Sequence, residues 1–141
     1  MHGEPADEGD GLWMVMATIQ RHRLDSVTLA LEGLTGFGGM TVSDCRGFGR
    51  GKVARVDDAS GPGGQAFDDV PPAPRQDADL VDFTAKVRLD IAVAGRDHAD
   101  AVVGAIVRAA HTGRKGDGKV FMWPLVRAVR VRTGEQDAAA I

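Results

Sequence analysis

A run of alternating apolar and polar residues from Val81 to Val93 most constrains the fold of this chain. Alternation with a period of two is typical of a β-strand with one buried face. The odd-numbered positions, which include Phe83 and Ala85, are therefore predicted to face the core. A helix is predicted next, with Asp97 as its cap. Its apolar stripe at helical spacing comprises Ala99, Val102, Val103, Ile106, Val107 and Ala110.

The rest of the chain divides into segments by the same reasoning. Residues 12–20 are nearly all apolar and predict a central strand that is covered on both faces. Residues 40–48 alternate and predict a second strand, residues 119–123 predict another, and residues 128–132 predict a short last strand after Pro124. A first helix is predicted from apolar residues at helical spacing, which are Leu24, Val27, Leu31 and Leu34.

The predicted order is β-α-β, a long loop, then β-α-β, which is the ferredoxin-like, split βαβ (βαββαβ) pattern of the α+β class. It implies an antiparallel sheet with both helices on one face. Val15, Ala17 and Ile19 are expected on the other, open face, so we expect an oligomer that covers this face. Val129 and Val131 of the last strand are expected to face the core.

Length and charge limit the possible classes of protein. A chain of 141 residues predicts one domain, over residues 12–141, behind a flexible tail at residues 1–11. The net charge of −3 argues against nucleic acid as a partner. No apolar run reaches membrane-spanning length and no signal peptide is recognisable, so we expect a cytoplasmic protein without direct membrane insertion. Cys45 is the single cysteine, which excludes an intramolecular disulfide.

The loop over residues 49–85 differs from the rest of the chain. Between Gly51 and Asp79 it has six aspartates, three cationic residues and four prolines, without apolar periodicity. Such long loops are usually functional or disordered. Two interpretations stay open, a tolerated surface insertion and a partner-binding loop that becomes ordered on binding.

Residues 112–122 read TGRKGDGKVFM and combine three glycines with cationic side chains. Glycines let main-chain N–H groups approach a ligand, so this stretch suits a phosphate cradle, although a solvated connection is the alternative. Arg130 and Arg132 are predicted on the same face of the last strand, where an anion between them would relieve their repulsion. The alternative is a pair of surface arginines matched by carboxylates. A third cationic cluster comprises Arg46, Arg50 and Lys52.

No catalytic group accompanies these cationic elements. The histidines share no motif with a nucleophile, and no Walker-type loop is present. Asp97 and His98 lack a third ligand, so no metal site is predicted. The sequence therefore argues against an enzyme, with a small nucleotide-processing enzyme as a rival hypothesis.

Several motifs in order resemble the PII signal-transduction family. They are TGRKGDGKVF at 112–121, VRVRTGE at 129–135, AAI at 139–141 and GMTVSDCRGFGR at 39–50, together with shorter matches at Asp82-Phe83, Lys86-Val87 and Arg23-Leu24-Asp25. The resemblance implies a homotrimer that binds ATP or ADP between subunits. It also implies a T-loop at residues 49–85, a B-loop at residues 112–119, and a target such as a membrane transporter or metabolic enzyme.

The resemblance also implies site residues. Gly47, Phe48, Gly49 and Arg50 match the base of the T-loop beside the nucleotide. Thr41, Asp90 and Ala92 match positions around the adenine. Gly116, Asp117, Gly118 and Lys119 match positions at the ribose and phosphates, as do Arg130 and Arg132 at the phosphates.

The chain departs from the family in its long loop. It has no tyrosine, which excludes uridylylation. The family's glutamine for Mg²⁺ and 2-oxoglutarate is Gly51 here, which argues against sensing 2-oxoglutarate, although Lys86 matches a lysine that contacts this anion. The leading hypothesis is a nucleotide-binding regulator. The runner-up is a divergent sensor of bicarbonate, AMP or a cyclic nucleotide.

Overall fold

A central strand, β1, organises the fold, because its hydrogen bonds join both halves of the chain. A computed structural model describes residues 11–49 and 83–141, so the predicted tail and most of the long loop lie outside the described residues. The elements are β1 (Leu12–Gln20), η1 (Arg21–Arg23), α1 (Leu24–Glu32), β2 (Thr41–Gly47), β3 (Thr84–Ala94), α4 (Arg96–Ala110), β4 (Gly118–Leu125) and η2 (Asp137–Ala140).

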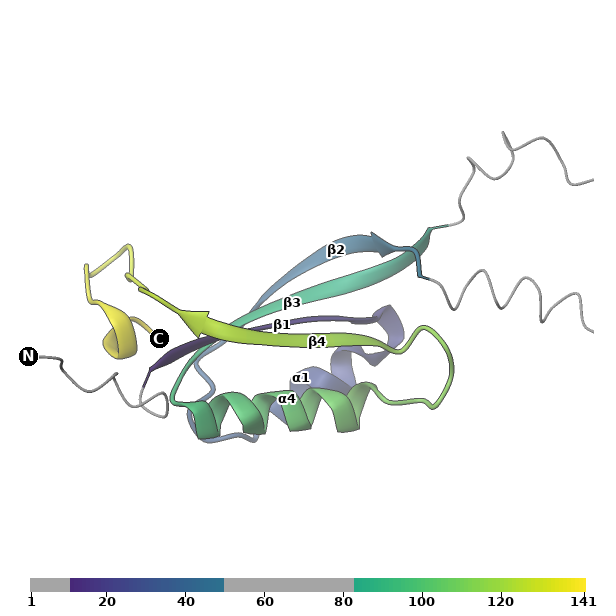
Figure 1. Cartoon of the computed structure of the whole chain (residues 1–141), viewed down its shortest axis with the longest axis horizontal. Helices are drawn as coiled ribbons and strands as arrows, with labels where there is room; N and C mark the ends of the chain where they lie inside the picture. Colours follow the sequence, from purple (N-terminus) through teal and green to yellow (C-terminus); the bar gives the residue numbers. More distant parts are fainter. Residues whose placement is uncertain (1–10, 50–82) are drawn as a thin grey trace, which may run out of the picture.

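The four strands form one antiparallel sheet in the order β2-β3-β1-β4. Both helices lie on the same face of this sheet (Figure 1). The predicted ferredoxin-like fold is therefore confirmed. The strand β3 begins at Thr84, opposite Gly47, so the two ends of the long loop leave the sheet as neighbours.

The core lies between the helices and the sheet. From Val87 to Val93 the predicted alternation of β3 is confirmed, because every second residue is buried. Phe83 is 52% exposed, contrary to the prediction that it faces the core, and Ala85 is exposed too. Here β2 and β3 continue beyond the helices as a two-stranded ribbon (Figure 1). The side chains that fill the core most completely are Ile19, Leu31, Leu89, Ile91, Ile106, Val15, Val27, Val93 and Val102.

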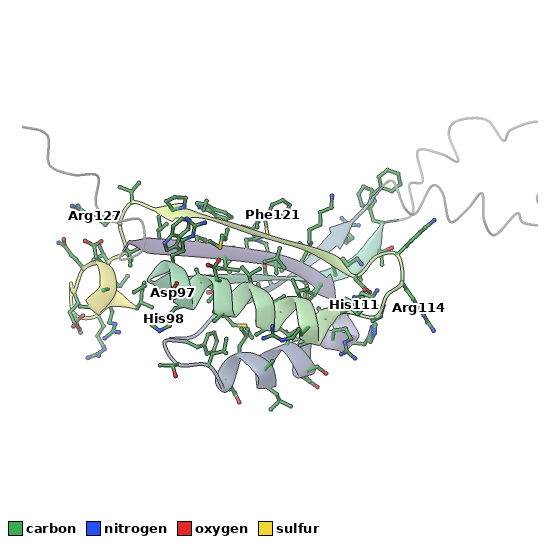
Figure 2. The ribbon with its side chains drawn as sticks, turned by 60° about the horizontal axis from the view of Figure 1, so that its bottom comes forward. Asp97, His98, His111, Arg114, Phe121 and Arg127 are labelled. Atoms are coloured by element: carbon green, nitrogen blue, oxygen red, sulfur yellow. The ribbon has the colours of Figure 1, made fainter. Side chains whose placement is uncertain are left out.

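The open face of the sheet is not the one predicted. Val15, Ala17 and Ile19 are buried under the helices, opposite the buried Ile91, Leu89 and Val87 of β3. Both sets of alternate positions in β1 are apolar, so the pattern alone does not distinguish the two faces. The open face instead has an apolar area, made by Met14 and Met16 of β1 and Phe121 and Trp123 of β4. Phe121 points away from the helices (Figure 2).

The predicted last strand is wrong. Over residues 128–132 there is only an isolated bridge between Val129 and Gln136, and Val129 and Val131 are 51% and 99% exposed rather than in the core. The chain turns back at Gly134, whose φ is +74°, before it reaches a strand partner. In contrast, β4 continues through Pro124, because an edge strand tolerates a residue without an N–H group.

Two details of α4 also differ from the prediction. Gly95 precedes the helix as its N-cap, and Asp97 lies inside the first turn without a capping hydrogen bond. Val107 is 52% exposed because it lies at the margin of the apolar stripe. At the other end of the helix, Arg23 of η1 donates hydrogen bonds to the Ala109 carbonyl, with Nε at 2.9 Å and Nη2 at 2.5 Å. This contact places η1 beside the C-terminal end of α4.

Candidate anion-binding site

The cradle loop (residues 112–119) is folded around the carboxylate of Asp117. This carboxylate accepts hydrogen bonds from the main-chain N–H groups of Thr112 at 2.7 Å and Gly113 at 2.9 Å, and from the Thr112 hydroxyl. Gln20, at the end of β1, donates to it at 3.3 Å. Asp117 thus holds the loop's two ends together rather than presenting its charge to a ligand.

These contacts perturb the acidity of Asp117. The hydrogen bonds from the Thr112 hydroxyl and then the Thr112 amide are the largest causes that lower its pKa to about 2, from 3.8. The Gly113 amide and His111, whose Nδ1 lies 3.8 Å from the carboxylate, act in the same direction. A lowered carboxyl pKa means that the folded loop favours the ionised form.

We expect the Asp117→Asn change to loosen the cradle loop at neutral pH. An amide offers one acceptor oxygen where the carboxylate offers two, so the N–H groups of Thr112 and Gly113 should exchange faster with solvent, measured by amide hydrogen exchange. The folded pKa is depressed, so the wild-type advantage should be complete above about pH 4 and disappear as the pH falls toward 2. Asp100→Asn, at an exposed position of α4, is the control. Equal exchange rates in all three proteins would contradict this role of Asp117.

A cleft of about 760 Å³ separates the cradle loop from the base of the long loop. Its size suits a small-molecule ligand. Lys86 of β3 spans the cleft wall, because its Nζ donates to the Gly116 carbonyl of the cradle loop. Seven of the predicted residues line the cleft, namely Gly47, Phe48, Gly49, Lys86, Gly116, Gly118 and Lys119.

The charge of the cleft is one-sided. Its basic lining residues come from four parts of the chain and are Arg21, His22, Arg46, Lys86, Lys115 and Lys119. Among the described residues that line it there is no aspartate or glutamate. Walls of one sign concentrate oppositely charged ligands, so the cleft suits an anion.

The other predicted residues lie elsewhere, and Arg50 is outside the described residues. Thr41 and Asp90 are directly opposite each other on the open face, and Ala92 follows on the same side. Arg88 donates hydrogen bonds of 3.0–3.2 Å to the carboxylate of Asp90. Thr41, Asp90 and Ala92 therefore do not line the cleft of their own chain.

The predicted arginine pair is also far from the cleft. The strand β4 runs from Gly118 at the cradle loop to Leu125, where the C-terminal arm (residues 126–141) begins. At 3.3–3.4 Å per residue this separation is roughly 23 Å. Figure 2 shows the arm residue Arg127 at the opposite end of the molecule from His111 and Arg114. Arg130 and Arg132 therefore do not reach the cleft of their own chain.

Residues 11–49 and 83–141 contain neither a candidate metal centre nor a candidate membrane-spanning helix. Within them, no three His, Cys, Asp or Glu side chains gather as metal ligands. No described helix has the length and apolar character needed to cross a membrane.

Comparison with known proteins agrees with this fold. The family model described as nitrogen regulatory protein P-II matches residues 12–135. The chain belongs to the P-II family. It is 39% identical to the P-II protein of Klebsiella oxytoca over 125 residues, which cover 89% of this chain and 96% of that protein. It is 40% identical to the P-II protein of Synechocystis sp. over 129 residues, which cover 90% and 97%.

A solved structure of a P-II protein is also similar. The Arabidopsis thaliana PII bound to citrate superposes with a TM-score of 0.64 at 30% identity and covers 94% of both chains. P-II proteins are signal-transduction regulators, so membership of this family defines the general class of this chain's function.

Several cleft residues of this P-II chain were missed by sequence reasoning, and three of them are consecutive. Gln20 ends β1, Arg21 and His22 directly follow it, and all three line the cleft beside the cradle loop. Only their position next to the cradle loop could have identified them. Because β1 and β4 are antiparallel neighbours, the end of β1 lies next to the start of β4. Cys45 is half-buried, lies opposite Lys86 and lines the cleft as well.

Proposed function

We propose that this chain is a PII-type regulator that binds an adenine nucleotide between subunits and controls a target protein through its long loop. The cationic cleft carries this proposal. It combines lysine and arginine side chains with the main chain of Gly47, Gly49 and Gly116, which suits the phosphates of ATP or ADP. The proposal assigns no catalytic step to the chain.

The location of the arginines supports a site shared between subunits. Arg132 lies at the far end of β4 from its own cleft, so a neighbouring copy would have to supply it. The apolar open face, with Met14, Met16, Phe121 and Trp123, offers a surface for such an association. We propose a cytoplasmic homotrimer whose target is a membrane transporter or a metabolic enzyme, with no role for nucleic acid. Both ends of the long loop lie at the cleft, so an occupied cleft would alter the loop's contacts.

Isothermal titration calorimetry with ATP, ADP and AMP, each with and without Mg²⁺ and 2-oxoglutarate, tests this function. We expect ATP or ADP to bind, and 2-oxoglutarate to have no effect because Gly51 replaces the family's glutamine. Lys119→Gln should weaken binding by about tenfold or more, since it removes a charge-assisted contact. Arg108→Gln, at an exposed position on α4, is the charge-matched control.

Two other results of the calorimetry would contradict the proposal or part of it. No heat with any nucleotide would reject the proposed function. Enhancement of ATP binding by 2-oxoglutarate would show that the inference from Gly51 is wrong.

A second candidate is a P-II-type sensor of another anion, such as bicarbonate, AMP or a cyclic nucleotide. Arg21 favours it, because it adds positive charge to the cleft beyond the two loops that suit a nucleotide. The citrate bound to the Arabidopsis relative is likewise an organic anion. The same calorimetry with bicarbonate and cyclic nucleotides would distinguish this candidate from the first.

A further inference from the structure

A smaller cavity, of about 190 Å³, lies between the C-terminal half of α4 and the start of β4, beside the cradle loop. Its apolar lining comes from the helix and from the sheet and comprises Ile19, Ile106, Val107, Ala110 and Val120. Ile19 and Ile106 are fully buried, whereas Val107 is 52% exposed. The cavity therefore extends from the core to the surface and opens beside Val107.

The polar groups around this cavity do not suit a charged ligand. They belong to the remaining lining residues, which are His111, Asp117, Gly118 and Lys119. The carboxylate of Asp117 already accepts hydrogen bonds from the cradle loop itself. Lys119 pairs with Thr18 on the face of the sheet opposite to Val120, so its side chain is directed away from the cavity. The side chain of His111 is 69% exposed and lies in solvent at the end of α4 (Figure 2).

Polar contacts hold both walls of the cavity in place. On the helix side, Arg23 donates hydrogen bonds to the carbonyl of Ala109, the residue next to Ala110. On the loop side, the N–H groups of Thr112 and Gly113 bind the carboxylate of Asp117. A cavity persists when the surrounding structure cannot collapse into it, so these contacts keep the space available.

We propose that this cavity is a ligand site separate from the anion cleft, and that it takes a small uncharged apolar molecule about the size of a benzene ring. The volume and the apolar lining carry the proposal. An engineered apolar cavity of about 150 Å³ in another protein stays dry and binds benzene. An ionic ligand would lose its hydration here without gaining a partner inside the cavity. The proposal holds whether or not the cleft binds a nucleotide.

The position of the cavity gives its occupant an effect on the cradle loop. Gly118 and Lys119 line both the cavity and the anion cleft. A molecule packed between this segment and α4 stabilises the closed loop, because it adds contacts that an opened loop lacks. By linkage, an anion that binds the closed loop in the cleft binds more tightly when the cavity is filled.

Titration of the full-length protein with benzene, without nucleotide, tests the site. Methyl NMR should show saturable shifts at Ile106, Val107 and Val120, with a dissociation constant on the order of 1 mM. Ala110→Leu should abolish the shifts because its side chain fills the cavity. Val107→Ser, at an exposed position that tolerates a polar side chain, should weaken binding by about fivefold or more. Leu29→Ser, which is 70% exposed on α1, is the matched control and should bind benzene as the wild type does.

Benzoate, which adds a carboxylate to the same ring, tests the chemical class of the ligand. It should bind about tenfold more weakly than benzene or worse. Tighter binding of benzoate would overturn the assignment of an uncharged ligand. Absent or unsaturable shifts, or shifts confined to Met14 and Met16 on the open face, would overturn the site itself.

Amide hydrogen exchange tests the effect on the cradle loop. Saturating benzene should slow the exchange of the N–H groups of Thr112 and Gly113 by about threefold or more, because the filled cavity opposes opening of the loop. Exchange that benzene leaves unchanged would overturn the coupling between the cavity and the loop. Both readouts are made without nucleotide, so their failure is distinct from a failure of the proposed function.

Discussion

Replacing Gly118 with alanine is expected to lower the free energy of unfolding by about 3 kcal/mol or more. Gly118 begins β4 with a φ of +109°, where a side chain is strained. A Cβ there would lie 1.8 Å from the carbonyl oxygen of Thr18 in β1. That oxygen belongs to the backbone of a central strand, so the clash can be relieved only by separating β1 from β4 or by moving the cradle loop.

Gly39→Ala provides the matched control for this prediction. Gly39 also has a positive φ, of +130°, but nothing lies within 4 Å of the Cβ that alanine would add. It should lose about 1 kcal/mol through backbone strain alone. Urea denaturation followed by circular dichroism, at equal protein concentrations, measures both values. Equal losses in the two variants would show that the contact with Thr18 does not matter.

Gly118 also shows what sequence reasoning can supply. Glycines between a helix and a strand, mixed with lysines, predicted that the backbone here approaches a phosphate ligand closely. The structure adds that at Gly118 this neighbour is β1 itself, and that Asp117 closes the loop from inside. A sequence shows which residues permit close approach, but not which partner they approach.

The strands show the same distinction between pattern and partner. The alternation around Leu89 and Ile91 was sufficient to predict β3, because only one of its faces is apolar. In β1, Met14 and Met16 alternate with equally apolar neighbours, so the buried face was assigned wrongly. Near Val131 the alternation was genuine but no strand was available to pair with it, and the residues form a turn instead.

The cleft was only partly predictable for a related reason. Glycines and cations of the two loops form recognisable motifs. Arg21 and His22 belong to no such motif, and they line the cleft because they directly follow the end of β1. The contact of Arg23 with the end of α4 places them there, and it joins residues 86 positions apart in the sequence. Such long-range placement is a property of the fold.

Mixing two defective variants should restore nucleotide binding to about a quarter of the sites if each site combines the cleft of one subunit with the arm of the next. Lys119→Gln damages the cleft, and Arg132→Gln damages the arm. Each variant alone should bind ATP about tenfold more weakly or worse. In randomly mixed trimers, about half of the clefts are intact and each meets an intact arm about half of the time.

The number of restored sites decides where the arm acts. Calorimetry of co-refolded subunits should show about a quarter of the wild-type sites at wild-type affinity, and Arg132→Gln refolded alone should show none. A site built within one chain would restore none, because every subunit carries a defect. Wild-type affinity in Arg132→Gln by itself would exclude the arm from the site. Because β4 separates the cradle loop from the start of the arm by roughly 23 Å, we expect restoration.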